Sequence, residues 1–121
     1  MIKAVKFVSI AVSDQDRALS FYTDKLGFRI ATDQPMGESG RWIEVAIPGA
    51  ETRLVLHHPA DTPDTIGTTA NVAFVSDDVF ATHATLADRG VSFEVEPEKS
   101  DWGSYAIFTD PDGNRFVVSS R

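Results

Sequence analysis

The chain has 121 residues and a mass of 13.2 kDa, so it is the size of one domain, and its 42% of hydrophobic residues is typical of a globular protein. It contains no cysteine, which excludes disulfides, thiolate metal sites and a cysteine nucleophile, and its net charge of −7, without a basic cluster, disfavours a nucleic-acid partner. The lack of a signal-peptide pattern and of any apolar run near the ~20 residues of a membrane span predicts a soluble, cytoplasmic protein with no membrane partner.

The first half of the chain predicts a strand, a helix and three further strands. The apolar residues 7–12 indicate the first strand, and Asp14 is a suitable N-cap for the helix that follows. Apolar side chains at helical spacing continue to Leu26, and Gly27 ends the helix. A loop rich in turn-forming residues is expected at 33–40. The three later strands of this half are predicted at residues 28–32, 41–47 and 53–57.

Residues 59–69 have the composition of a linker, and the same order of elements returns beyond them. Asp78 is a suitable N-cap, the following helix ends at Gly90, and a loop is expected at 97–103. The strands of this half are predicted at residues 71–76 and 91–95 and in a hairpin over 104–119.

The turn of that last hairpin carries the strongest local signal in the chain. It reads Asp110-Pro111-Asp112-Gly113-Asn114, between two apolar runs. Pro111 has the φ that the second position of a tight turn needs, and Gly113 adopts a positive φ without a Cβ clash. The stretch therefore predicts two strands joined by a tight turn.

Equivalent residues of the two halves are separated by a nearly constant offset. Three pairs lie 63 residues apart: Gly27 and Gly90, Trp42 and Tyr105, and Pro48 and Pro111. One offset across a helix end, a strand and a hairpin indicates an internal duplication, with βαβββ modules at about residues 1–58 and 70–121 and a linker between them. Neither module can bury its sheet alone, so we expect the modules to pack together or against those of a second chain.

The duplicated pattern resembles the vicinal oxygen chelate superfamily, the group of glyoxalase I, bleomycin-resistance proteins, extradiol dioxygenases, methylmalonyl-CoA epimerase and fosfomycin-resistance enzymes. The residues that carry the resemblance are Val12-Ser13-Asp14, Ala18 to Tyr22, Leu26-Gly27-Phe28 and Asp110 to Asn114. It covers essentially the whole chain and implies one α+β domain over residues 1–121. In such a fold two βαβββ modules form a cup-shaped mixed sheet with the helices outside. The resemblance also implies a ligand in the cup and a homodimer.

Metal-dependent members of this superfamily take His or Gln from the first strand, Glu from the fourth, His from the fifth and Glu from the eighth. The metal chelates two adjacent substrate oxygens. The matching positions here are Phe7, Val55, Asn71 and Val117. Three of these side chains have no donor atom, and a neutral amide is a weak ligand. The sequence therefore predicts no metal at the family's positions and no cofactor, which counts against glyoxalase, epimerase and extradiol dioxygenase chemistry.

Two other residues could carry proton transfer. His57 lies two residues after Val55, so strand alternation directs it to the same face, and Glu44 is expected on the neighbouring strand. A His and a carboxylate in one cup could act as general acid and base. The alternative is that both side chains are solvated at the edge of the sheet.

Four aromatic residues are expected on the concave face or in the loop beside it: Phe7, Trp42, Trp102 and Tyr105. Together they predict a pocket for a flat or apolar ligand, with Val55 and Val117 in its lining. Ser9 and Asn71 would add neutral hydrogen-bonding groups. The alternative is that the aromatic rings only fill the cup.

Two functions follow from these residues. The first is a small-molecule-binding protein of the glyoxalase/bleomycin-resistance type that holds an apolar or aromatic ligand without a metal. The second is a glyoxalase- or dioxygenase-like enzyme (a lyase, an isomerase or an oxidoreductase) that uses His57 and Glu44, or a metal at displaced positions. The apolar residues at the metal positions and the aromatic cup favour the first.

Overall fold

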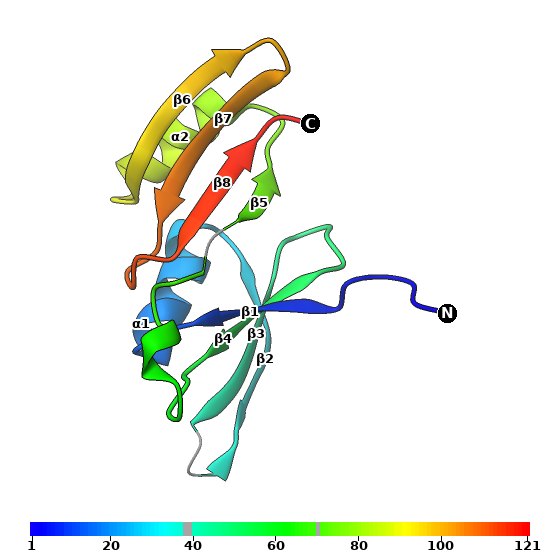
Figure 1. Ribbon diagram of the computed structural model, residues 1–121, viewed down its shortest axis with the longest axis vertical. Coiled ribbons are helices and arrows are strands. Elements are labelled where there is room, and N and C mark those ends of the chain that lie inside the picture. The colour runs from blue at the N-terminus through cyan, green and yellow to red at the C-terminus, as the bar shows by residue number, and fades with distance from the viewer. Residues whose placement is uncertain (38–39, 70) are drawn as a thin grey trace. The chain divides into compact units, whose positions relative to one another are not determined.

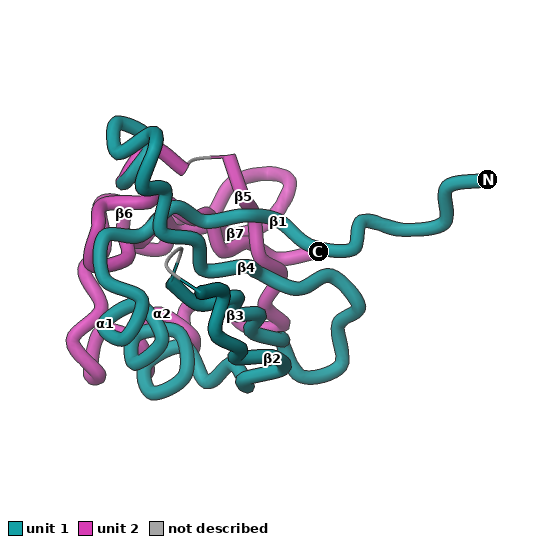
Figure 2. The backbone as a smooth tube through the Cα atoms, turned by 90° about the horizontal axis from the view of Figure 1, so that it is seen from below, with its two compact units in different colours: residues 1–66 teal, residues 67–121 magenta. Residues whose placement is uncertain are grey.

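The chain forms two units, residues 1–66 and 67–121 (Figure 2). The computed structural model describes residues 1–37, 40–69 and 71–121. The boundary between the units falls inside the segment 59–69, where the composition predicts a linker. No helix in these described ranges is long and apolar enough to cross a membrane.

Unit 1 contains a four-stranded mixed sheet with the order β1-β4-β3-β2 (Figure 1). β1 runs parallel to β4, and the other neighbouring strands are antiparallel. A helical segment follows β1, and a short 3-10 helix, η3, follows β4 at Pro63–Thr65. The strands and helical segments before η3 are β1 (Phe7–Ala11), α1 (Gln15–Ser20), the π-helical turn η1 (Phe21–Lys25), β2 (Arg29–Pro35), β3 (Arg41–Ala46) and β4 (Arg53–His57).

Unit 2 repeats this topology with the order β5-β8-β7-β6, and β5 runs parallel to β8. Its elements are β5 (Val72–Val75), α2 (Val79–Asp88), β6 (Ser92–Ser100), β7 (Gly103–Thr109) and β8 (Arg115–Ser119). The same strand order, the same parallel pair and the same helix position confirm the predicted α+β fold of two βαβββ modules.

In each unit the apolar core lies on the face of the sheet that carries the helix. In unit 1, α1 lies against β4, and Ile43 and Leu56 are fully buried on this face together with Tyr22 of the helical segment. In unit 2, α2 lies against β6 and β7, and Phe74 stacks on the buried Phe116 with ring centroids 5.3 Å apart. Strand residues alternate between faces, so every second side chain of each strand is left on the face without a helix.

Three expected element boundaries are wrong, and all involve edge strands. β2 continues to Pro35, where a loop was expected from residue 33. β6 continues to Ser100 through Pro97, where the turn-forming residues predicted a loop at 97–103. Proline is tolerated there because β6 is an edge strand and its register against β7 shifts between Val95 and Glu98. β5 begins at Val72, because Asn71, expected at the start of this strand, has a φ of 65°.

The hairpin turn at residues 110–114 forms as predicted. Gly113 N donates to Asp110 O at 3.0 Å, and Gly113 has a φ of 89°. The Asp110 carboxylate accepts hydrogen bonds from Asp112 N at 3.0 Å, Asn114 N at 2.9 Å and Asn114 Nδ2 at 2.8 Å. The turn is therefore held by one carboxylate as well as by backbone bonds.

Asn114 also fixes the turn to the segment that begins unit 2. Its Oδ1 accepts a hydrogen bond from Thr69 N at 2.9 Å, and Arg115 N donates to Thr69 O at 2.8 Å. A Cβ on Gly67 would clash with the backbone oxygen of Asp112, so this segment passes the turn at a distance that only glycine permits. The Asp-Pro-Asp-Gly-Asn stretch therefore has a structural role: it holds the β7–β8 turn and fixes it to the segment before β5.

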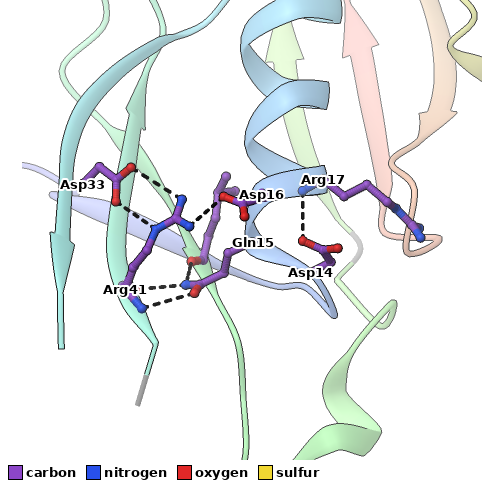
Figure 3. A network of polar contacts seen from close by, with 7 residues as sticks. Asp14, Gln15, Asp16, Arg17, Asp33 and Arg41 are labelled. Atoms are coloured by element: carbon purple, nitrogen blue, oxygen red, sulfur yellow. Dashed lines mark hydrogen bonds and ion pairs between the residues drawn. The ribbon is translucent and has the colours of Figure 1, made fainter. Parts of the chain in front are cut away.

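A second polar network joins α1 to the ends of β3 and β4 (Figure 3). Gln15 Nε2 donates to Arg41 O at 2.7 Å and to Leu56 O at 3.0 Å, and Arg41 N donates to Gln15 Oε1 at 3.1 Å. The Arg41 guanidinium pairs with Asp16 at 2.6 Å and with Asp33 at 3.0 Å. These hydrogen bonds, first to Asp16 and then to Asp33, raise the pKa of Arg41.

Replacing Asn114 by alanine should destabilise the fold by about 3 kcal/mol, because it leaves Thr69 N without its acceptor and removes one donor from the Asp110 carboxylate. Urea unfolding of Asn114→Ala against the wild type measures this loss. Thr85→Ala, on the exposed surface of α2, is the control and should change the free energy of unfolding by less than about 0.5 kcal/mol. Equal effects of the two substitutions would contradict a structural role for the turn.

Candidate functional site

The face of the unit 1 sheet opposite α1 carries half of the residues that the sequence predicts for a ligand site, together with both candidate catalytic residues. We call it the helix-free face of unit 1. The register places Ser9 beside Val55, and Val55 beside Glu44, across β1, β4 and β3. The residues that define the face are Phe7, Ser9, Trp42, Glu44, Arg53, Val55 and His57.

An aromatic pair lies on this face. The rings of Phe7 and Trp42 meet edge to face, with centroids 5.6 Å apart and planes at 84°. Both side chains are half-buried. The pair supplies flat apolar surface at the position where metal-dependent relatives are expected to carry their first ligand.

Glu44 is held between an indole and a guanidinium. Its Oε2 accepts a hydrogen bond from Trp42 Nε1 at 2.7 Å, and its Oε1 accepts one from Arg53 Nη1 at 2.9 Å. The residue is only 9% exposed. The bond from Trp42, followed by the bond from Arg53, lowers the pKa of Glu44, and the charge of Lys6 adds to the effect. Each carboxylate oxygen therefore accepts one hydrogen bond, and the lowered pKa makes the Glu44 carboxylate a weaker base than an ordinary one.

His57 shares this face at the exposed end of β4, in register with Ala11. No hydrogen bond joins its imidazole to Glu44 in the part of the chain that the structure describes. The structure brings the two residues to one sheet face without assembling an acid–base pair, and their catalytic role stays a prediction. The next residue, His58, places Nδ1 3.1 Å from Val12 O.

The helix-free face of unit 2 carries a second aromatic pair. Trp102, in the turn between β6 and β7, stacks on Tyr105 with centroids 5.8 Å apart and planes at 22°. Tyr105 Oη donates to Glu98 Oε2 at 3.4 Å, and Trp102 is 60% exposed. Val117 lies on the same face of this sheet, in register with Ile107. Asn71 precedes the strand on which it was expected, so strand alternation assigns it to neither face.

The residues at the family's metal positions do not fit a divalent metal. Phe7 and Val117 offer no donor atom, Val55 is buried and apolar, and Asn71 lies outside the strand that carries the ligand in metal-dependent relatives. Within residues 1–37, 40–69 and 71–121, no three His, Asp or Glu residues are grouped as a metal site requires.

Arg53 is a residue of this face that the sequence reasoning left without a role. It lies two residues before Val55 on β4, so the alternation that selected Val55 and His57 selects Arg53 as well. Strand alternation alone does not identify Glu44 as the partner of Arg53, because the contact between them depends on the pairing of β3 with β4.

Glu44→Gln should lower the free energy of unfolding by about 2 kcal/mol at neutral pH, because glutamine places an NH2 group, which cannot accept, at one of the two oxygen positions that meet Trp42 and Arg53. The folded-state pKa of Glu44 is depressed, so the stability it provides is fully present above its ordinary value of 4.5 and is lost as the pH falls through the folded-state pKa. The difference in the free energy of unfolding between the wild type and Glu44→Gln should therefore become smaller at acidic pH.

Thermal or urea unfolding over a pH series measures this gap. Glu51→Gln is the matched control in the same unit, since Glu51 is exposed on the connection between β3 and β4. A gap for Glu44→Gln that is independent of pH would contradict the assigned role of the ionised carboxylate.

Comparison with known proteins agrees with this architecture. The model of the Glyoxalase/Bleomycin resistance protein/Dioxygenase superfamily matches residues 4–118. The chain is 42% identical over 118 residues to the uncharacterized protein YetH of Bacillus subtilis (strain 168), and the match covers 98% of each chain.

Two solved structures show the same fold at similar identity. TnmS3, described as an antibiotic binding protein from Streptomyces sp. CB03234, is 40% identical with a TM-score of 0.89, covering 98% of this chain and 96% of that one. A glyoxalase/bleomycin resistance protein from the same organism is 39% identical with a TM-score of 0.84, covering 97% of this chain and 100% of that one. The chain belongs to the Glyoxalase/Bleomycin resistance protein/Dioxygenase superfamily.

Proposed function

We propose that this protein binds a small apolar or aromatic molecule, without a metal, and that the residues contacting the ligand include Phe7, Ser9 and Trp42. Val55 lies on the same face but is buried, so it supports the site without an exposed surface of its own. The observation that carries the proposal is the edge-to-face pair of Phe7 and Trp42 at the family's first ligand position. Rings present a large apolar area and lose little conformational freedom on binding. The exposed stack of Trp102 on Tyr105 offers a similar surface in unit 2.

A relative supports the same function. TnmS3, 40% identical to this chain, is described as an antibiotic binding protein. Small-molecule pockets are lined mainly by apolar and aromatic side chains with a few placed polar groups, which is the character of the helix-free face of unit 1. The proposal includes self-association as a homodimer, which sedimentation equilibrium tests separately.

The enzymatic alternative has less support from the geometry. A general base needs a free oxygen or nitrogen within hydrogen-bonding reach of the substrate. Both oxygens of Glu44 already accept hydrogen bonds from Trp42 and Arg53, and its lowered pKa reduces its basicity. His57 would then have to act without the carboxylate that the sequence suggested as its partner.

Phe7→Ala should weaken the binding of flat aromatic compounds about tenfold, since it removes one ring of the pair. Isothermal titration with 2-methylnaphthalene and doxorubicin measures the loss, and fosfomycin, a small phosphonate, should not bind. Phe80→Ala is the matched control, because Phe80 is an exposed phenylalanine on α2. Lack of binding by both aromatic compounds, or an equal loss in the two variants, would overturn the proposal.

Divalent metals should leave the melting temperature unchanged. A metal bound to the native state stabilises it by RT ln(1 + [L]/Kd), which gives several kcal/mol for a tight site. Differential scanning fluorimetry after treatment with EDTA, repeated with added Mn²⁺, Fe²⁺, Ni²⁺ or Zn²⁺, checks this expectation. A saturable rise with one metal, together with elemental analysis that finds this metal in the purified protein, would support the enzymatic alternative instead.

A further inference from the structure

Arg53 has unused hydrogen-bonding capacity on the helix-free face of unit 1. A guanidinium has five N–H donors. In the part of the chain that the structure describes, the Arg53 side chain makes one hydrogen bond, from Nη1 to Glu44 Oε1. Its side chain is 45% exposed, whereas that of Glu44 is 11% exposed. The carboxylate is therefore largely covered, whereas the arginine side chain is partly exposed to solvent.

The guanidinium is also held in place. The ion pair with Glu44 fixes one edge of it, and Trp42 Nε1 fixes the carboxylate from the other side. A ligand that binds the remaining N–H groups would not have to order a free arginine side chain, which lowers the cost of binding. Lys6 adds a second positive charge near Glu44, so this corner is locally positive in a chain of net charge −7.

Arg53 is next to the aromatic pair. The register makes Arg53 the direct neighbour of Phe7 across β1 and β4, and neighbouring strands lie about 4.8 Å apart. The face thus places outward N–H donors beside a flat apolar surface. The Trp42 indole donates to Glu44, so its N–H is already used, and Arg53 is the cationic donor nearest to the pair along β4.

We propose that Arg53 determines specificity, by selecting flat aromatic ligands that carry an acceptor oxygen, such as a carboxylate or phenolate, over neutral and cationic ones. The inference rests on the proposed function and adds the ligand's polar chemistry to it. The aromatic body lies against Phe7 and Trp42, and the oxygen accepts hydrogen bonds from the N–H groups of Arg53 that Glu44 leaves unused. A planar guanidinium matches a carboxylate better than an ammonium does.

Three probes with one ring system and different charge test the inference: 2-naphthoate, 2-methylnaphthalene and 2-naphthylmethylammonium. Isothermal titration of the wild-type protein should give an affinity for 2-naphthoate at least about tenfold higher than for 2-methylnaphthalene, with the ammonium weakest. This comparison needs no variant, so it stands even where a substitution at Arg53 impairs folding. Equal affinities, or a preference for the ammonium, would overturn the inference.

Arg53→Gln should then weaken 2-naphthoate binding about 10- to 100-fold and change the affinity for 2-methylnaphthalene less than about threefold. Arg17→Gln makes the same charge change at an exposed residue of α1, on the opposite side of the sheet. It should leave the affinities for all three probes unchanged. Melting curves of both variants separate lost folding from lost binding.

The outcomes also separate the inference from the proposed function. Binding of all three probes with one affinity, weakened about tenfold by Phe7→Ala, would leave the aromatic site in place and remove the role of Arg53. An equal loss of all three probes in Arg53→Gln would mean that Arg53 supports the face without selecting the ligand. A lack of binding by every probe would overturn both.

Discussion

The alternation of side chains along a strand is the constraint on which this structure depends. In each βαβββ unit one helical segment covers one face of a four-stranded sheet, and the apolar side chains of every second residue are buried beneath it. The intervening side chains are then committed to the other face. On β4 this rule places Leu54 and Leu56 on the face beneath the helix, and Arg53, Val55 and His57 on the other face, where Val55 is buried as well. The same strands thus build the core and present the candidate site.

On the helix-free face of unit 1, the Glu44 carboxylate accepts hydrogen bonds from both Trp42 and Arg53 and so holds their side chains in place. Glu44 is nearly buried, and a buried charge is tolerated only when its hydrogen bonds are satisfied. Trp42 and Arg53 satisfy it from the same strand and from the neighbouring one. This arrangement lowers the pKa of Glu44 and leaves the Arg53 side chain partly exposed, in a family whose metal positions carry Phe7, Val55, Asn71 and Val117 here.

Short sequence patterns predicted an element correctly where a residue type has one dominant structural role, such as an aspartate that caps a helix. Asp14 and Asp78 cap the two helices as expected, accepting from Arg17 N and Ala81 N at 3.0 Å each. The turn at 110–114 forms for the reasons that its Pro and Gly suggest. The prediction was wrong at Pro97, because a proline considered alone predicts the end of a strand. A proline is tolerated on an edge strand, and which strand lies at the edge depends on the whole sheet.

The sequence by itself determined the duplicated topology, the helix caps, the hairpin turn and the apolar residues at the family's metal positions, because these depend on spacing and on side-chain chemistry. Only the tertiary structure decided which polar groups meet. It joined Glu44 to Trp42 and Arg53 instead of to His57, and it moved Asn71 off its strand with a φ of 65°. Hydrogen bonds of this kind depend on strand register and burial, which residues far apart along the chain fix together.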